Sequence, residues 1–275
     1  HAAPRPTVLL CRADLAAEQA GFAVTPVPVG TWASLSGPPQ RWMQRLRLQA
    51  EPILRGRLSF FDLHEQPLGT PVDWHRDHGS GQAAPRRYAP SIDYRDVRIA
   101  GDCKYVWEPN RHHHWVVLGR AYRATGDGRY ARAVVDQLNG WLDACPFGFG
   151  MPWRSGLELA VRLINWAWAL DLIAPADVLT PVTWRRVLQT VDLHLWQIAR
   201  TFSGGSSANN HLIGEAAGAF VAACYFPALR RSAEVAGVSR EILCDQVHQQ
   251  VFPDGGSVEQ AVGYEVFVLQ LLVAA

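Results

Sequence analysis

The sequence predicts an all-α fold in which successive helices pack antiparallel in layers. After about Asn110, apolar residues recur at helical spacing almost throughout the chain. The stretch from Leu157 to Ile173 carries apolar residues on two faces, as a helix between two layers does. The links between the helical stretches are short Gly/Pro turns, so at least six helices form a layered array or a toroid.

The clearest single helix is predicted to begin near Trp184. Its apolar residues fall at helical intervals, namely Trp184, Val187, Leu188, Val191, Leu195, Ile198, Ala199 and Phe202. A second such stripe consists of Tyr130, Val134, Leu138, Trp141 and Leu142. Further helices are expected at about His211–Tyr225, at about Arg240–Val251 and from Val258 onward.

The first hundred residues are predicted to be irregular, because prolines interrupt them repeatedly. Helical pieces are expected at about Arg12–Gly21 and Trp42–Arg55, a short strand at Leu58–Leu63, and a long ordered loop at Gly69–Pro90. We therefore divide the chain into an irregular N-terminal part, residues 1–100, and a helical core, residues 101–275.

Composition excludes several classes of protein. Hydrophobic residues make up 48% and charged residues 19% of the chain, which is typical of a globular protein. The net charge of +1 lacks the basic excess of a general nucleic-acid binder. No apolar run reaches the roughly 18 residues of a membrane span, and no secretory signal is visible. The five cysteines include no CxxC pair, which argues against a zinc finger.

The segment GGSSANNHLIGE, residues 204–215, joins two predicted helices. Asn209 and Asn210 are suited to cap the second helix, which begins near His211. His211 and Glu215 stand four residues apart and therefore share one helical face. One interpretation is ordinary capping with a solvated His–Glu pair. The other is a preorganised donor site for an anion at the helix N-terminus.

The segment FPDGGSVEQAVGYEVF, residues 252–267, contains a turn followed by another predicted helix. Ser257 is a candidate N-cap, and Glu259 lies near the helix start. Tyr264 is expected about two turns into this helix, with Gln260 one turn before it. Tyr264 is either a half-buried core residue or a functional side chain.

A third polar segment, residues 101–122, carries Trp107, Asn110, Arg111 and three consecutive histidines. Neighbouring residues on a helix diverge by about 100°, so the three histidines cannot all ligate one metal ion. We expect no metal site here and interpret the segment as a polar helix start that lines a cleft. Glu158 and Arg162, farther on, have the spacing of a surface ion pair.

Together these segments resemble the heparinase II/III family of polysaccharide lyases. The matching pieces are GTPVDW (69–74), Ile92–Tyr94, GDCKYVWEPNRH (101–112), AYRATGD (121–127), WRSGLELAVRLINWAW (153–168), NNHLIGE (209–215) and DGGSVEQAVGY (254–264). The resemblance implies an incomplete (α/α) toroid, the N-terminal catalytic domain of a lyase whose C-terminal β-sandwich is absent here. The uncapped apolar stretch Tyr264–Ala275 is consistent with a chain truncated inside its toroid core.

The resemblance implies β-elimination across a uronic acid in a heparin/heparan sulfate-like or alginate-like polysaccharide. Asn210 would bind the uronate carboxylate, His211 would assist or act as a base, and Tyr264 would be the general acid, or both base and acid. The expected substrate-binding residues are Trp107, Asn110, Arg111, His112, Trp153 and Glu215.

Further expectations follow from the same resemblance. The partner is an acidic polysaccharide, with no nucleic acid and no membrane span, and the oligomeric state is left open. A further catalytic histidine comes from the β-sandwich in this family, so the fragment alone is expected to be inactive. No cofactor is expected in this fragment, and a structural metal is compatible with the missing domain. The family resemblance favours a periplasmic or secreted protein.

Two other classes stay open. Helical toroids also host glycoside hydrolases, which need two carboxylates flanking the bond. The candidate carboxylates are Glu108, Glu158, Glu215 and Glu259. A non-catalytic protein that binds surface polysaccharide is the other class. Product chemistry separates the three, because a lyase makes an unsaturated, UV-absorbing end, a hydrolase a reducing end without a new double bond, and a binder neither.

Overall fold

The computed structural model describes Val29, residues 38–205 and residues 208–275. The helix predicted at Arg12–Gly21 lies outside the described residues. The described chain divides into two compact units. Of the described residues, the N-terminal unit comprises Val29, residues 38–158 and Trp168–Thr183, and the C-terminal unit comprises Leu159–Ala167, residues 184–205 and residues 208–275. The predicted boundary at residue 100 stays a prediction.

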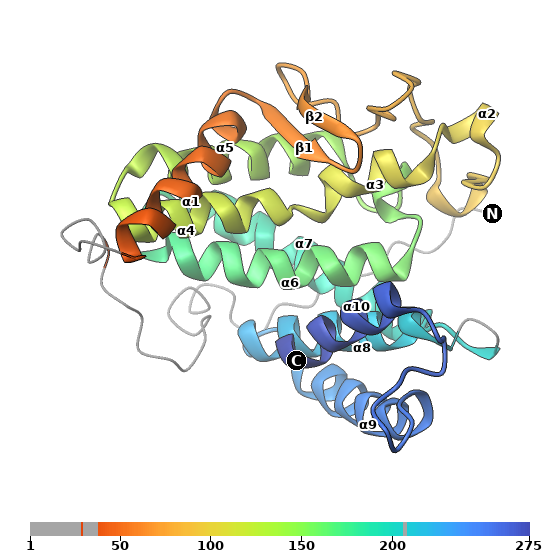
Figure 1. Ribbon diagram of the computed structural model, residues 1–275. Coiled ribbons are helices and arrows are strands. Elements are labelled where there is room, and N and C mark those ends of the chain that lie inside the picture. The colour runs from red at the N-terminus through yellow and green to blue at the C-terminus, as the bar shows by residue number, and fades with distance from the viewer. Residues whose placement is uncertain (1–28, 30–37, 206–207) are drawn as a thin grey trace. The chain divides into compact units, whose positions relative to one another are not determined.

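The N-terminal unit opens with a helix and a hairpin (Figure 1). Helix α1 (Pro38–Leu54) is followed by β1 (Arg57–Phe60) and β2 (Leu63–Pro67), which pair antiparallel with Leu58 opposite Gln66. This hairpin is the only sheet in the part of the chain that the structure describes. The strand predicted at Leu58–Leu63 therefore extends too far, because Phe61 adopts a φ of 52° and turns the chain. The long loop at Gly69–Pro90 is confirmed.

Four more helices follow in this unit: α2 (Val97–Ala100), α3 (Cys103–Arg111), α4 (His113–Thr125) and α5 (Gly128–Ala144). Aspartates cap three of them. Asp96, Asp102 and Asp127 each accept a hydrogen bond from the backbone N–H two residues further on. Helices α1, α4 and α5 pack against one another. A short glycine turn links α4 to α5, as predicted for the connections between helices, with Gly126 at a φ of 75°.

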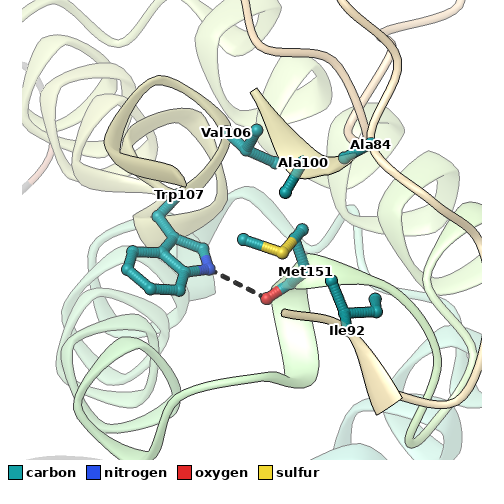
Figure 2. Close-up of a cluster of buried hydrophobic side chains, with 6 residues drawn as sticks. All are labelled: Ala84, Ile92, Ala100, Val106, Trp107 and Met151. Atoms are coloured by element: carbon teal, nitrogen blue, oxygen red, sulfur yellow. Dashed lines mark hydrogen bonds between the residues drawn. The ribbon is translucent and has the colours of Figure 1, made fainter. Parts of the chain in front are cut away.

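A buried cluster ties the loop region to α3 (Figure 2). Its members are Ala84, Ile92, Ala100, Val106, Trp107 and Met151. Trp107 donates a hydrogen bond from Nε1 to the backbone oxygen of Met151 at 2.9 Å, so the indole is satisfied while it is buried. The cluster fixes α3 against the short 3₁₀ turn at Met151–Trp153.

The remaining helices are α6 (Gly156–Ile173), α7 (Pro181–Arg200), α8 (Asn210–Tyr225), α9 (Ser232–Gln250) and α10 (Val262–Ala274). Beyond Asn110, the described residues form helices and turns and no strand, and the mostly helical fold predicted from periodicity is confirmed. None of the helices within these residues combines the length and the apolar character that crossing a bilayer requires.

Two predicted helix starts are wrong. The helix expected from Arg240 begins at Ser232, because Gly237 and Ser239 resemble a turn in sequence while Ser239 is buried within α9. The helix expected from Val258 begins at Val262, because Gln260 adopts a φ of 50° and interrupts the helical backbone. Tyr264 therefore lies in the first turn of α10 and not two turns into it.

Helix α8 is the central element of the C-terminal unit and is buried along nearly its whole length. It packs against α9 and α10, and a shared core includes Ile213, Ala216, Leu243, Val268 and Leu271. Figure 1 shows these three helices together at the C-terminal end of the chain.

A close helix–helix approach also defines this unit. Gly218 of α8 faces Ala160 of α6, and a Cβ added at Gly218 would lie 2.3 Å from the backbone oxygen of Ala160. A separation that short is a clash with the backbone, which no side-chain rotation relieves. Glycine is therefore required at this position by packing and not by backbone conformation.

We predict opposite effects for two glycine-to-alanine substitutions in neighbouring helices. Gly218→Ala should lower the free energy of unfolding by about 1–3 kcal/mol, because it overpacks the contact between α8 and α6. Gly237→Ala in α9 is the matched control, since no atom lies within 4 Å of its added Cβ. It should raise stability by about 0.5–1 kcal/mol through helix propensity. Chemical denaturation of both variants measures this difference, and equal effects would contradict the packing argument.

Candidate functional site

The first residues of α8 form the cap that the sequence predicts. Asn209 precedes the helix, and its side-chain Oδ1 accepts a hydrogen bond from the backbone N–H of His211 at 3.1 Å. This bond satisfies one of the N–H groups that have no partner within the helix. Asn210 is the first helical residue and is buried.

A carboxylate from a distant segment binds Asn210. The Nδ2 of Asn210 donates to Oε1 of Glu259 at 2.8 Å and to Oε2 at 2.9 Å. The backbone N–H of Asn210 also approaches Oε1 of Glu259 at 3.5 Å. A negative charge at this position is favoured by the positive end of the α8 dipole. The two polar segments that the sequence singled out therefore meet in one unit.

The loop before α10 places Glu259. Phe252 and Gly256 close a tight turn through a backbone bond of 2.8 Å, and Val258 donates to the backbone oxygen of Gln250 at 3.0 Å. Ser257 was expected to cap a helix, and its Oγ instead accepts the backbone N–H of Glu259 at 3.2 Å in a local turn. This turn delays the start of α10 to Val262.

Tyr264 is exposed at the beginning of α10, with 54% of its surface accessible. It is therefore not the half-buried core tyrosine of the alternative interpretation. Farther along the helix, Val268 and Leu271 are buried and pack into the core that includes Ile213 of α8. The apolar part of α10 thus anchors the helix while its first turn leaves the phenol accessible to solvent.

His211 and Glu215 do not share one environment, although they stand one turn apart on α8. His211 is exposed and Glu215 is buried. Both oxygens of Glu215 accept hydrogen bonds from Ser203, at 2.7 Å from its backbone N–H and 2.9 Å from its Oγ. Burial raises the pKa of Glu215, against the opposing effect of these two hydrogen bonds. Glu215 therefore ties the first part of the loop between α7 and α8 to α8.

In the N-terminal unit, Asn110 lies in the interior at the end of α3. Its Nδ2 donates to the backbone oxygens of Trp74 and Val106, both at 2.8 Å. Its Oδ1 accepts the indole N–H of Trp141 at 2.8 Å. An amide with these partners holds the loop, α3 and α5 together.

Arg111 forms the strongest ion pair near this segment. Its Nε and Nη2 donate to the two oxygens of Glu158 at 2.7 and 2.8 Å, and its Nη1 donates to Glu108 at 3.1 Å. Burial opposes the charge of the guanidinium, yet Glu158 and Glu108 raise the pKa of Arg111 above its usual value. The spacing of Glu158 and Arg162 suggested an ion pair on the surface. That expectation is wrong, because both residues are buried and Arg162 contacts His194.

The aromatic residues predicted to bind substrate also lie in the interior. His112 joins α3 to α4 at a φ of 64°, and its ring stacks on Trp115 with 3.7 Å between centroids. Trp153 is buried and donates its indole N–H to the backbone oxygen of Cys145 at 3.0 Å. The three consecutive histidines separate accordingly, since His112 and His114 are buried and His113 is exposed. The expected single polar helix start is therefore a junction between two helices.

The predicted site residues thus fall into two groups. Asn210, His211, Glu215 and Tyr264 belong to the C-terminal unit; the N-terminal unit holds Trp107, Asn110, Arg111, His112 and Trp153. The contacts of the latter group are internal, and their expected binding to substrate stays a prediction. Sequence reasoning did not foresee that Glu259 binds Asn210, because no local pattern pairs residues that far apart. Across residues 38–205 and 208–275, no group of three His, Cys, Asp or Glu side chains could hold a metal ion.

Comparisons with known proteins identify the family. The family described as Heparinase II/III N-terminus matches residues 69–275. A heparin-sulfate lyase of Bacteroides stercoris is 24% identical over 209 residues, which is 68% of this chain and 31% of that protein. A heparin-sulfate lyase of Pedobacter heparinus is 24% identical over 179 residues, or 63% of this chain and 27% of that protein.

A solved structure shows the fold. The heparan sulfate lyase HepC from Pedobacter heparinus matches with a TM-score of 0.62 at 17% identity, over 84% of this chain and 38% of that chain. This likeness shows that the chain shares the helical fold of the matched part of that structure. The chain belongs to the heparinase II/III family, and residues 69–275 correspond to the N-terminal domain of that family. It spans about a third of the length of the curated relatives that it matches.

His114 makes the stability of this domain dependent on pH. Its Nε2 lies 2.8 Å from Oε1 of Gln137, and burial lowers the pKa of His114 to about 4. The folded state therefore holds the neutral ring, while the unfolded chain takes up a proton near the usual pKa. This contribution to stability is present above pH 6.5 and is lost as the pH falls toward 4.

We predict that His114 accounts for a loss of about 3 kcal/mol in the free energy of unfolding between pH 7 and pH 4. Denaturation curves of the wild type and of His114→Asn across this range measure the contribution. Since asparagine does not titrate here, the variant should be less stable at pH 7 and should lose less on acidification. Parallel pH profiles for the two proteins would contradict the prediction.

Proposed function

We propose that this chain is the N-terminal part of a polysaccharide lyase that cleaves heparin- or heparan sulfate-like chains by β-elimination. The observation that carries the proposal is the direct contact of Asn210 with Glu259, five residues before Tyr264. This contact supports a shared site for the candidate anion donor and the candidate proton donor. The curated relatives, which are heparin-sulfate lyases, support the substrate class.

The chemical problem of the reaction is the weak acidity of the C5–H bond beside the uronate carboxylate. Removing this proton places further negative charge on the carboxylate, so hydrogen-bond donors aimed at it lower the barrier. A base takes the C5 proton, and the released electron pair forms the C4–C5 double bond. The C4–O bond breaks, and an acid protonates the leaving glycosidic oxygen.

The proposed roles belong to polar groups at the starts of α8 and α10. Asn210 donates to the substrate carboxylate from the N-terminus of α8, where the helix dipole also favours an anion. Tyr264, exposed in the first turn of α10, protonates the leaving oxygen or serves as both base and acid. His211, exposed next to Asn210, assists the carboxylate or acts as the base. None of these steps uses a cofactor.

A hydrolase needs two carboxylates free to flank the scissile bond. In this structure all four candidates already accept hydrogen bonds from protein groups. Glu108 and Glu158 bind Arg111, Glu215 binds Ser203, and Glu259 binds Asn210. These contacts account for each carboxylate without a role in hydrolysis, and the hydrolase and the non-catalytic binder are outcomes of the assay below.

The test uses the protein at its full natural length, because this chain spans about a third of its curated relatives. Tyr264→Phe should lower turnover by about 10²–10⁴-fold with little change in folding or polymer binding. Asn210→Ala should cost about 10²–10³-fold. UV absorbance of the unsaturated product measures both, on heparin, heparan sulfate and alginate.

The matched control is Tyr88→Phe, which removes the hydroxyl of another exposed tyrosine and should leave turnover unchanged. Near-wild-type turnover of Tyr264→Phe would refute the assigned mechanism. A new reducing end without UV absorbance would indicate hydrolysis, and binding without either product would indicate a non-catalytic protein.

A further inference from the structure

The orientation of the Asn210 amide decides whether it attracts or repels an anion. An asparagine side chain presents two N–H donors on one side and an acceptor oxygen on the other. Rotation by half a turn exchanges the two sides with almost no change of shape. A substrate carboxylate gains from the N–H side and is repelled by the oxygen. Asn210 can therefore act as a donor to the substrate only if a contact within the protein fixes the orientation of its amide.

Glu259 makes this selection. A carboxylate without a proton has acceptors only, so the side of the Asn210 amide that faces it must be the NH₂ group. The two distances from Nδ2 to the Glu259 oxygens, 2.8 and 2.9 Å, are nearly equal. Both oxygens therefore lie on the same side of Nδ2. The two N–H bonds of an amide diverge by roughly 120°, so the second N–H of Asn210 points in another direction.

The same carboxylate also holds the main chain of Asn210. Oε1 of Glu259 lies 3.5 Å from the backbone nitrogen of Asn210, and the positive end of α8 favours its charge. Since backbone and side chain are held by one group, the side-chain torsions of Asn210 are restricted. A buried donor fixed in this way needs no reorganisation when an anion arrives.

Glu259 is itself held by the protein. Its backbone N–H donates to Ser257 Oγ, and the neighbouring Val258 is bonded to the backbone oxygen of Gln250. The side chain of Gln250 in turn donates from Nε2 to the backbone oxygen of Asn209 at 3.2 Å. The loop and the start of α8 are therefore joined at two points, which keeps the carboxylate at a fixed position relative to Asn210.

We propose that Glu259 is a positioning residue for the elimination, which holds the Asn210 amide so that its second N–H is directed at the substrate carboxylate. This inference rests on the proposed function and deepens it. A competing account makes Glu259 a mask that occupies the donor and must leave when substrate binds. The two accounts predict opposite changes in activity when Glu259 is removed.

The test is a double-mutant cycle between Glu259→Ala and Asn210→Ala in the full natural protein, measured as unsaturated product per folded molecule. Glu259→Ala should lower kcat by about 10- to 100-fold with little change in KM, the usual cost of losing a partner that orients an active group. In the Asn210→Ala background, the same substitution should cost less than about 3-fold, because its effect passes through Asn210.

Glu259→Gln serves as the conservative variant and keeps the side-chain volume if Glu259→Ala folds poorly. Glutamine offers both an acceptor and a donor, so it binds the amide in either orientation. Its kcat should lie between those of the wild type and Glu259→Ala. Glu241→Ala is the matched control, since it removes an exposed carboxylate from α9 in the same unit and should leave kcat unchanged.

Each outcome has one meaning. A rise in kcat/KM for Glu259→Ala would overturn the inference and show that Glu259 masks the Asn210 amide instead of positioning it. Wild-type kcat in that variant, or equal losses in both backgrounds, would overturn the inference while the proposed function stands. A wild-type protein that makes no unsaturated product from any uronate polymer would overturn the proposed function, and the inference would fall with it.

Discussion

The hydrogen bonds between Asn210 and Glu259 are the constraint on which the candidate site depends. They join residues 49 positions apart, so they form only once the C-terminal unit has folded. Asn209 starts α8 and thereby fixes where Asn210 stands, and the turn at Ser257 delays α10 until Val262. The Glu259 carboxylate, which accepts hydrogen bonds, then meets the Asn210 amide, which donates them, at the positive end of the buried helix α8. The local turn chemistry and the tertiary packing support the same arrangement.

The N-terminal unit uses its polar residues differently. Asn110 bonds to two backbone oxygens and one indole, and Arg111 pairs with two carboxylates, so their hydrogen-bonding groups are directed inward. Buried polar groups with such partners favour one packing of the core, because any other packing that left them without hydrogen bonds would cost free energy. A polar cluster in sequence is thus not by itself a sign of a ligand site. Exposure separates Tyr264 and His211 from these residues.

Much of the fold could be predicted from periodicity, and the site only in part. The apolar stripe beginning at Trp184 identified α7, and Asn209 was recognised as a cap because capping is a local property. The start of α9 was missed since Gly237 resembles a turn, although the helix continues through it with Val235 and Ser239 buried on either side. The pairing of Arg111 with Glu158 and of Asn210 with Glu259 could not be foreseen, because tertiary structure alone brings those residues together.

The proposed function requires an elimination and excludes a hydrolysis. The most direct measurement is digestion of heparan sulfate by the full natural protein in H₂¹⁸O, followed by mass spectrometry of the fragments. Elimination consumes no water, so the account predicts fragments with an unsaturated uronate end and no ¹⁸O incorporated during cleavage. Fragments heavier by one water molecule that carry ¹⁸O at the cleaved bond would contradict it.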